Sequence, residues 1–231
     1  MTTEETPMPT GEQILPFYIV CDESASMAYN GGIDAINEGL PDLHSAIAAD
    51  PLVSDKSRIG LIAFSDDAEV VVPLARASDI EQMPGMMEKG ATNYGAAFEC
   101  LQTTIAQDVS LLRNDGYQVF RPAVFFITDG EPTDTGWEAA HAALTDKSSN
   151  SNAPNIIAFG VDGSEPSTIG RVATIKGAAF IADRGINPGA ALKEIMRSLT
   201  QSIVSSTGAA KPQLVVPPPP DGTIAVDLDE I

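Results

Sequence analysis

The chain has 231 residues, 43% of them hydrophobic, and its 32 acidic residues outnumber 13 basic ones to give a net charge of −19 at pH 7. This length fits one domain with extensions, and no apolar stretch approaches the roughly 18 residues that a membrane-spanning helix requires. The negative charge disfavours binding to nucleic acid or to an anionic membrane. Two cysteines, Cys21 and Cys100, are too few for a disulfide framework, so we expect both to be small core residues.

The beginning of the chain is polar and acidic. It lacks the basic start and the apolar centre of a secretory signal. We therefore expect residues 1–13 to be a flexible leader and the protein to be cytoplasmic. The main domain is expected to cover residues 14–206.

The first apolar run, Phe17–Cys21, stops at Asp22, and Ser24 and Ser26 follow at alternate positions. A continuous run rich in β-branched and aromatic residues predicts a strand buried on both faces of a parallel sheet. Open α/β sheets bind ligands just beyond the carboxyl ends of such strands. One carboxylate and two hydroxyls are hard oxygen donors, which suit Mg²⁺, Mn²⁺ or Ca²⁺ better than zinc.

The next elements alternate between helix and strand. Apolar residues at spacings of three and four predict a helix over Ile33–Ile47, with a kink or break at Pro41. The strands Arg58–Phe64 and Glu69–Leu74 are joined by a short turn, which predicts an antiparallel pair, and Pro73 favours an edge position. Further along, the pattern predicts a short helix and loop at Ser78–Lys89, a helix after an N-cap at Asn93, a strand at Ala123–Thr128, a helix at Trp137–Lys147, a strand at Asn155–Val161, a short helix at Pro166–Ile175, a strand at Ala178–Ala182 and a final helix from Pro188.

This alternation predicts an α/β fold with a doubly wound, Rossmann-like sheet and helices on both faces. We expect six mostly parallel strands with one antiparallel edge strand. The strand before Asp22 and the strand before Asp129 should be neighbours on either side of the switch point, with the glycine-bounded loop of Thr92 above them. The residues expected to converge there are Asp22, Ser24, Ser26, Thr92 and Asp129.

Three short sequences, D-E-S-A-S-M, G-A-T-N-Y-G and F-I-T-D-G, occur in this order. Together they resemble the von Willebrand factor A (vWA) domain with a metal-ion-dependent adhesion site (MIDAS), over about Leu15–Ser206. The resemblance implies that Ser24 and Ser26 bind a divalent metal directly, that Thr92 binds directly or through water, and that Asp22 and Asp129 act partly through bridging waters. It also implies a protein partner that supplies an Asp or Glu carboxylate to the metal.

Within this family, three stretches are similar to the bacterial intracellular tellurium-resistance (TerY-type) group: Gly32–Leu43, Arg58–Leu74 and Phe126–Asp134. Such proteins tend to be encoded beside protein kinases and phosphatases. The resemblance implies a non-enzymatic scaffold in a stress-response or phospho-signalling complex.

The alternative interpretation is a metal-dependent phosphatase of haloacid-dehalogenase type. That class requires D-x-D after the first strand, with the second Asp as general acid, and here Ser24 occupies that position. A degenerate site that no longer binds metal is a further alternative, against which the intact residue set argues. The acids Glu23, Asp66, Asp67, Glu131 and Asp134 are expected near the site, so a basic partner surface bearing one acid fits best.

Other polar and apolar residues have simpler interpretations. We expect Glu23 and Asp134 to be solvated and Trp137 to be a packing anchor, while Tyr94 fits packing and partner contact equally. The methionines of the loop, Met83, Met86 and Met87, are expected to fill gaps in the core.

The last part of the chain, residues 207–231, is expected to be a Pro-rich linker and an acidic, apolar tail. Four consecutive prolines end Lys211–Pro220, which favours a stiff extended spacer. Asp221–Ile231 is either disordered or a docking segment. One hypothesis is that an acid among Asp227, Asp229 and Glu230 reaches a metal site.

Overall fold

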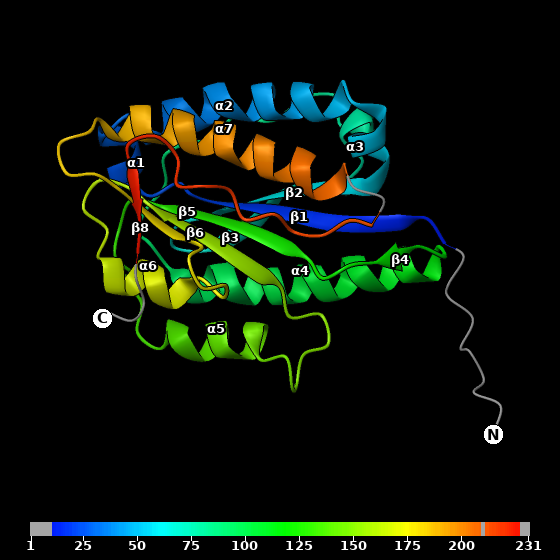
Figure 1. The fold of residues 1–231 in the computed structure, drawn as a ribbon. Coiled ribbons are helices and arrows are strands. Elements are labelled where there is room, and N and C mark those ends of the chain that lie inside the picture. The colour runs from blue at the N-terminus through cyan, green and yellow to red at the C-terminus, as the bar shows by residue number, and fades with distance from the viewer. Residues whose placement is uncertain (1–10, 209–210, 227–231) are drawn as a thin grey trace.

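The computed structural model describes residues 11–208 and 211–226. The strands are β1 Gln13–Asp22, β2 Ser57–Phe64, β3 Ala68–Ala75, β4 Gln118–Val119, β5 Ala123–Thr128, β6 Asn155–Gly160, β7 Ala179–Ala182 and β8 Thr223–Ala225. They form one sheet in the order β3-β2-β1-β5-β6-β7-β8, with β4 beside β1 (Figure 1). The predicted mostly parallel α/β fold is confirmed.

Helices cover both faces of this sheet (Figure 1). One face carries α1 Ala25–Tyr29, α2 Gly32–Ala48, α3 Pro51–Lys56 and α7 Pro188–Thr207, and the other carries α4 Tyr94–Asn114, α5 Trp137–Thr145 and α6 Pro166–Val172. A short 3₁₀ turn, η1 Ala77–Asp79, follows β3. In the described part of the chain, no helix has the length and apolar character needed to cross a bilayer.

The core lies on both sides of β1, as a continuous apolar strand predicts. Phe17 and Ile19 pack in the cluster beneath α2 and α7, whereas Tyr18 and Val20 pack in the cluster above α4. Successive side chains of a strand point to opposite faces, so a strand covered on both sides must be apolar at every position.

The position of β1 at the centre of the sheet creates the site. β2 pairs with one side of β1 and β5 with the other, and both pairs are parallel. Cys21 lies opposite Ile127, so the residues after these two strands leave the sheet together. The chain turns in opposite directions from this point, which leaves a crevice beyond the strand ends.

The sheet differs from the expected one at its edges. Over the described residues it has eight strands rather than six, and both edges are antiparallel: β3 against β2, as predicted, and β8 against β7. The second edge was missed because β8 has only three residues, Thr223–Ala225, and follows a proline run. The available signal was the alternation of Ile224 and Val226, within the stretch Asp221–Ile231 that was expected to be either disordered or a docking segment.

The expected linker lies against the domain. Val215 accepts a hydrogen bond from Ser202 at 2.6 Å and donates one to Ser206 at 2.8 Å, which fixes the segment along α7. Pro212 and Pro217 are buried. Residues 211–226 therefore belong to the folded unit, while the acids proposed to reach a metal site, within 227–231, lie outside the described residues.

The expected leader ends inside the sheet. Glu12 accepts a backbone hydrogen bond from Gln118 at 2.9 Å, and Gln13 begins β1. The earlier part of the leader, residues 1–10, lies outside the described residues.

Several local expectations need correction. α2 runs from Gly32 to Ala48 with Pro41 inside it, so of the predicted kink or break the break does not occur. Close packing of α2 on α7 holds it together: a Cβ on Gly39 would lie 2.6 Å from the side chain of Met196. Met87 is 70% exposed, whereas Met83 and Met86 are buried as predicted.

Two further expectations were partly wrong. Cys100 is only partly buried, unlike Cys21. The short helix expected within Ser78–Lys89 is reduced to η1, because only its first residues make helical hydrogen bonds.

Candidate metal centre

Asp22 ends β1 at the base of the crevice and is fully buried. Its Oδ1 accepts a hydrogen bond from the backbone of Ser24 at 2.8 Å, and its Oδ2 accepts one from the Thr128 hydroxyl at 2.6 Å. Burial raises the pKa of Asp22 above its ordinary value, and these hydrogen bonds oppose that rise. The carboxylate is thus held in one orientation at a site where its charge is poorly solvated.

A row of hydroxyls connects this loop to the loop after β5. Ser24 is at the N-cap of α1, and its Oγ lies 3.1 Å from the Oγ of Ser26. Ser26 in turn donates a hydrogen bond of 2.8 Å to Asp129 Oδ1. Three of the predicted residues therefore form a connected chain of oxygen atoms across two loops.

Asp129 is 5% exposed, although it lies at the rim of the crevice. Burial raises the pKa of Asp129 to about 6, and the hydrogen bond from Ser26 acts in the opposite direction. The negative charge of Asp22 adds to the rise. Two buried carboxyl groups whose pKa values are both raised mark a place where a cation would be stabilising.

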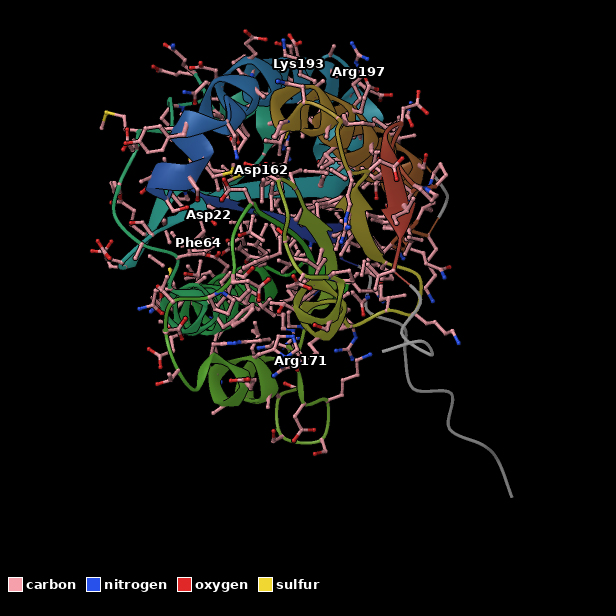
Figure 2. The ribbon with its side chains drawn as sticks, turned by 90° about the vertical axis from the view of Figure 1, so that its left-hand side faces the viewer. Asp22, Phe64, Asp162, Arg171, Lys193 and Arg197 are labelled. Atoms are coloured by element: carbon pink, nitrogen blue, oxygen red, sulfur yellow. The ribbon has the colours of Figure 1, made fainter. Side chains whose placement is uncertain are left out.

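Thr92 approaches from the third loop. A Cβ built on Gly130 would lie 3.4 Å from Thr92 Oγ1 and 4.0 Å from Ser26 Oγ, so both hydroxyls border one point. Thr133 fixes the loop, because its backbone N–H donates to the carbonyl of Thr92 at 2.8 Å. The structure therefore brings all five predicted residues to the same end of the sheet, at which Figure 2 labels Asp22.

An ion pair holds the Thr92 loop against the first loop. The ammonium of Lys89 lies 2.7 Å from the carboxylate of Glu23, and the Lys89 backbone N–H donates to the Glu23 carbonyl at 2.8 Å. Glu23 was expected to be solvated, but it is 4% exposed because the Thr92 loop covers it. Ala25 adds a backbone hydrogen bond to Gly90 at 3.2 Å.

Two further residues at this site were not predicted from the sequence. The side-chain amide of Asn30 donates to Asp129 Oδ2 at 2.6 Å and to Asp162 Oδ2 at 3.1 Å. In the sequence, Asn30 is followed by two glycines and indicates only a turn. Asp162 lies just after the end of β6, as Asp22 lies at the end of β1 and Asp129 just after β5, and this recurrence was the available signal.

Three neighbouring residues have structural roles. Tyr94 is fully buried and donates a hydrogen bond to the Gly130 carbonyl at 2.9 Å, so its role is packing. Trp137 packs on it with ring centroids 5.5 Å apart, as predicted for a packing anchor. Asp134 was expected to be solvated, but it accepts hydrogen bonds from the Tyr94 and Gly95 backbone at the start of α4.

The donor set fits a hard divalent cation. It consists of carboxylate and hydroxyl oxygens, with no sulfur or imidazole. Among the described residues, no group of three or more His, Cys, Asp or Glu side chains is placed to hold a metal. The serine and threonine hydroxyls are therefore essential to any metal site here.

The chain is similar to known proteins in sequence and in fold. The sequence model of the von Willebrand factor type A domain matches residues 17–132, half of the chain. A comparison with curated proteins found no significant match. Proximal thread matrix protein 1 from the mussel byssus, solved with a zinc-occupied MIDAS motif, has a TM-score of 0.60 and 16% identity over 84% of this chain and 48% of that one.

Two bacterial structures are similar to the same extent. The pilus adhesin SpaC from Lactobacillus rhamnosus GG, in its open conformation, has a TM-score of 0.64 and 14% identity, covering 84% of this chain and 30% of that one. The vWF domain of the pilus tip protein Mfa5 from Porphyromonas gingivalis has a TM-score of 0.61 and 10% identity, covering 87% and 99%. At these identities the likeness concerns the fold, and this chain spans about half the length of the mussel protein. From the match over half of its sequence, we conclude that the chain belongs to the von Willebrand factor type A domain family.

Proposed function

We propose that this chain is a divalent-metal-dependent protein-binding module. The ligands would be the hydroxyls of Ser24, Ser26 and Thr92, with Asp22 and Asp129 binding directly or through water. The observation that carries the proposal is the convergence of these oxygens around two buried carboxylates whose pKa values are raised. A cation would supply the positive charge that this arrangement lacks.

The donor set also determines how such a site would bind a partner. Neutral hydroxyl ligands neutralise little of the positive charge of a cation. The ion therefore stays electron-poor and attracts a further anionic ligand. Asp22 and Asp129 are each engaged by hydrogen bonds that limit their movement towards it. A carboxylate from an Asp or Glu of a partner protein would complete the coordination.

Mg²⁺ or Mn²⁺ is the proposed ion, with Ca²⁺ as a further choice, because oxygen-only sites favour hard cations. Zinc occupies the corresponding motif in the mussel protein. Ion competition on this chain would rank the metals directly.

The finer assignment is a cytoplasmic scaffold in a stress-response or phospho-signalling complex. It is supported by the stretches similar to the TerY-type group, such as Gly32–Leu43, and by the neighbouring kinases and phosphatases of that group. The net charge of −19 supports a protein partner over nucleic acid or an anionic membrane.

We assign no catalytic step to the site. The phosphatase alternative needs a general acid two residues after Asp22, and Ser24 stands there with its hydroxyl hydrogen-bonded to Ser26. A phosphatase assay in Mg²⁺ is expected to give no turnover above that of the Asp22→Ala variant.

Affinity capture from native lysate tests the binding function. The arms are wild type in Mg²⁺, wild type in EDTA, Ser26→Ala in Mg²⁺, and Ser148→Ala in Mg²⁺ as a matched control on an exposed turn. We expect the same partner bands to be lost in EDTA and with Ser26→Ala, and kept with Ser148→Ala. Partners retained in EDTA and with Ser26→Ala would show that binding does not use the metal.

A further inference from the structure

A second depression lies on the same end of the sheet, next to the metal centre. It has a volume of about 890 Å³ and is formed by the loops after β6 and β7 together with β8. We call it the β6–β8 pocket. The residues that define its character are Asp162, Glu165, Ile181, Asp183, Arg184 and Ile224.

The pocket adjoins the metal centre through Asn30. Asp162 lines it and shares the side-chain amide of Asn30 with Asp129, a proposed metal ligand. Figure 2 shows Asp162 and Asp22 on the same face of the molecule. A partner segment with one side chain on the metal would therefore have its neighbouring residues over this pocket.

Isoleucine side chains contribute apolar surface to the pocket. Ile224 from β8 is 55% exposed, and Ile186 from the loop before α7 is 37% exposed. Ile181 of β7 also lines the pocket and is 8% exposed. Exposed isoleucines gathered at one depression can cover the aliphatic part of a bound side chain.

The polar part is negative. Three lining acids, Asp162, Glu165 and Asp183, are exposed, and Arg184 is the one base among the described lining residues. Within the part of the chain that the structure describes, the carboxylates of Glu165 and Asp183 form no ion pair or side-chain hydrogen bond. A purely apolar or anionic group placed here would leave these acids uncompensated.

We propose that the β6–β8 pocket receives a lysine or arginine from the same partner segment that places its Asp or Glu on the metal. The alkyl stem of a basic side chain would lie on the isoleucines while its cationic head faces the carboxylates. Such a partner carries the acid that the metal requires and the positive charge that a protein of net charge −19 attracts. This inference rests on the proposed metal-dependent binding.

A random peptide library displayed on phage tests the pairing. The immobilised chain is panned in Mg²⁺ and eluted with EDTA, so that only metal-dependent binders are recovered. We expect the recovered peptides to share an Asp or Glu and a Lys or Arg at a recurrent spacing. Metal-dependent peptides that share the acid without the base would overturn the pocket assignment and leave the metal function standing.

Charge reversal at the pocket sharpens the test. Asp183→Arg changes an exposed pocket acid, and Asp115→Arg makes the same change at an exposed position after α4 as the matched control. A peptide selected on wild type should bind the Asp183→Arg variant at least about fivefold more weakly than wild type, because one exposed charge pair is lost and a repulsion is added. Its affinity for the Asp115→Arg variant should be almost unchanged. Peptides selected on the Asp183→Arg variant should still share an Asp or Glu but should no longer be enriched in Lys or Arg.

Two results would contradict the inference. Equal affinity of the two variants for the selected peptide would overturn the pocket assignment alone. Recovery of no metal-dependent peptides, even on wild type, would overturn the pocket assignment and the proposed function together.

Discussion

Ser26 Oγ donates a 2.8 Å hydrogen bond to Asp129 Oδ1, although 103 positions separate the two residues in the sequence. The contact exists because β1 and β5 are parallel neighbours and both end at the same edge of the sheet. It joins a proposed direct ligand to a carboxylate whose pKa is raised to about 6. A metal ion bound between these loops would replace this hydrogen bond, and Ser26 and Asp129 would each offer an oxygen ligand to the ion.

Metal affinity should depend on pH through Asp129. Its pKa is raised by burial to about 6 in the folded protein without metal, so below pH 6 a proton competes with the cation. Affinity for Mg²⁺ should be nearly constant above pH 7 and fall by up to about tenfold per pH unit below 6. Titrations between pH 5 and 8 check this, and a flat profile would contradict it.

The raised pKa of Asp129 also contributes to the pH dependence of the stability of the metal-free protein. A carboxyl group with a raised pKa binds its proton more tightly in the folded than in the unfolded state. Its contribution to stability therefore becomes unfavourable as the pH rises from the pKa of the unfolded state, near 3.8, through the pKa of the folded state, about 6. The increase in melting temperature caused by Mg²⁺ should therefore be largest above pH 6. The Asp129→Asn variant should lack this pH-dependent contribution of the Asp129 carboxyl group to stability.

Asn30→Ala should destabilise the metal-free protein by about 1–2 kcal/mol, because two carboxylates lose a hydrogen-bond donor. Urea unfolding in EDTA measures the change. Asn114→Ala, an exposed position at the end of α4, is the control and should stay within about 0.5 kcal/mol. Equal stability of the two variants would show that the bridge to Asp129 and Asp162 contributes nothing.

Glu23→Gln should loosen the loop that carries Thr92. The variant loses the ionic part of the contact with Lys89, which costs no more than about 1 kcal/mol because Lys89 is partly exposed and solvent screens the pair. Amide hydrogen exchange at Ala91 and Thr92 should become faster, and Mg²⁺ affinity should fall a few-fold. Glu69→Gln, which changes the exposed partner of the same lysine, is the control and should affect both measurements less.

Val226→Asp should destabilise the domain by about 2–4 kcal/mol, because Val226 is 7% exposed and packs in the core beside β7. Ala225→Asp, at an exposed neighbouring position, should have a much smaller effect. Chemical denaturation compares the two. Similar small effects would mean that the end of the described chain does not contribute to the core.

Most of the sheet could be predicted because long apolar strands leave a clear pattern. Phe17–Cys21 and Ala123–Thr128 are apolar at almost every position, since both faces of each strand are covered by helices. Their order and the acids that end them also indicated where side chains would converge. The role of those residues as metal ligands stays a prediction.

What could not be predicted depends on tertiary contacts. β8 has three residues, too few for a periodic signal, and it is a strand because β7 offers a free edge. Asn30 has the local sequence of a turn, and only the fold places it between Asp129 and Asp162. Pro41 stays within a helix because packing of α2 on α7 outweighs the loss of one backbone donor.

The central claim is that hydroxyls from separate loops hold a divalent cation at the ends of β1 and β5. Calorimetric titration of wild type, Ser26→Ala and Ser148→Ala with MgCl₂ and MnCl₂ at pH 7.5 tests it most directly. We predict saturable binding at one site in wild type and Ser148→Ala, and affinity weaker by about tenfold or more in a still-folded Ser26→Ala. Absence of saturable binding of either ion to wild type, or equal binding by Ser26→Ala, would contradict the claim.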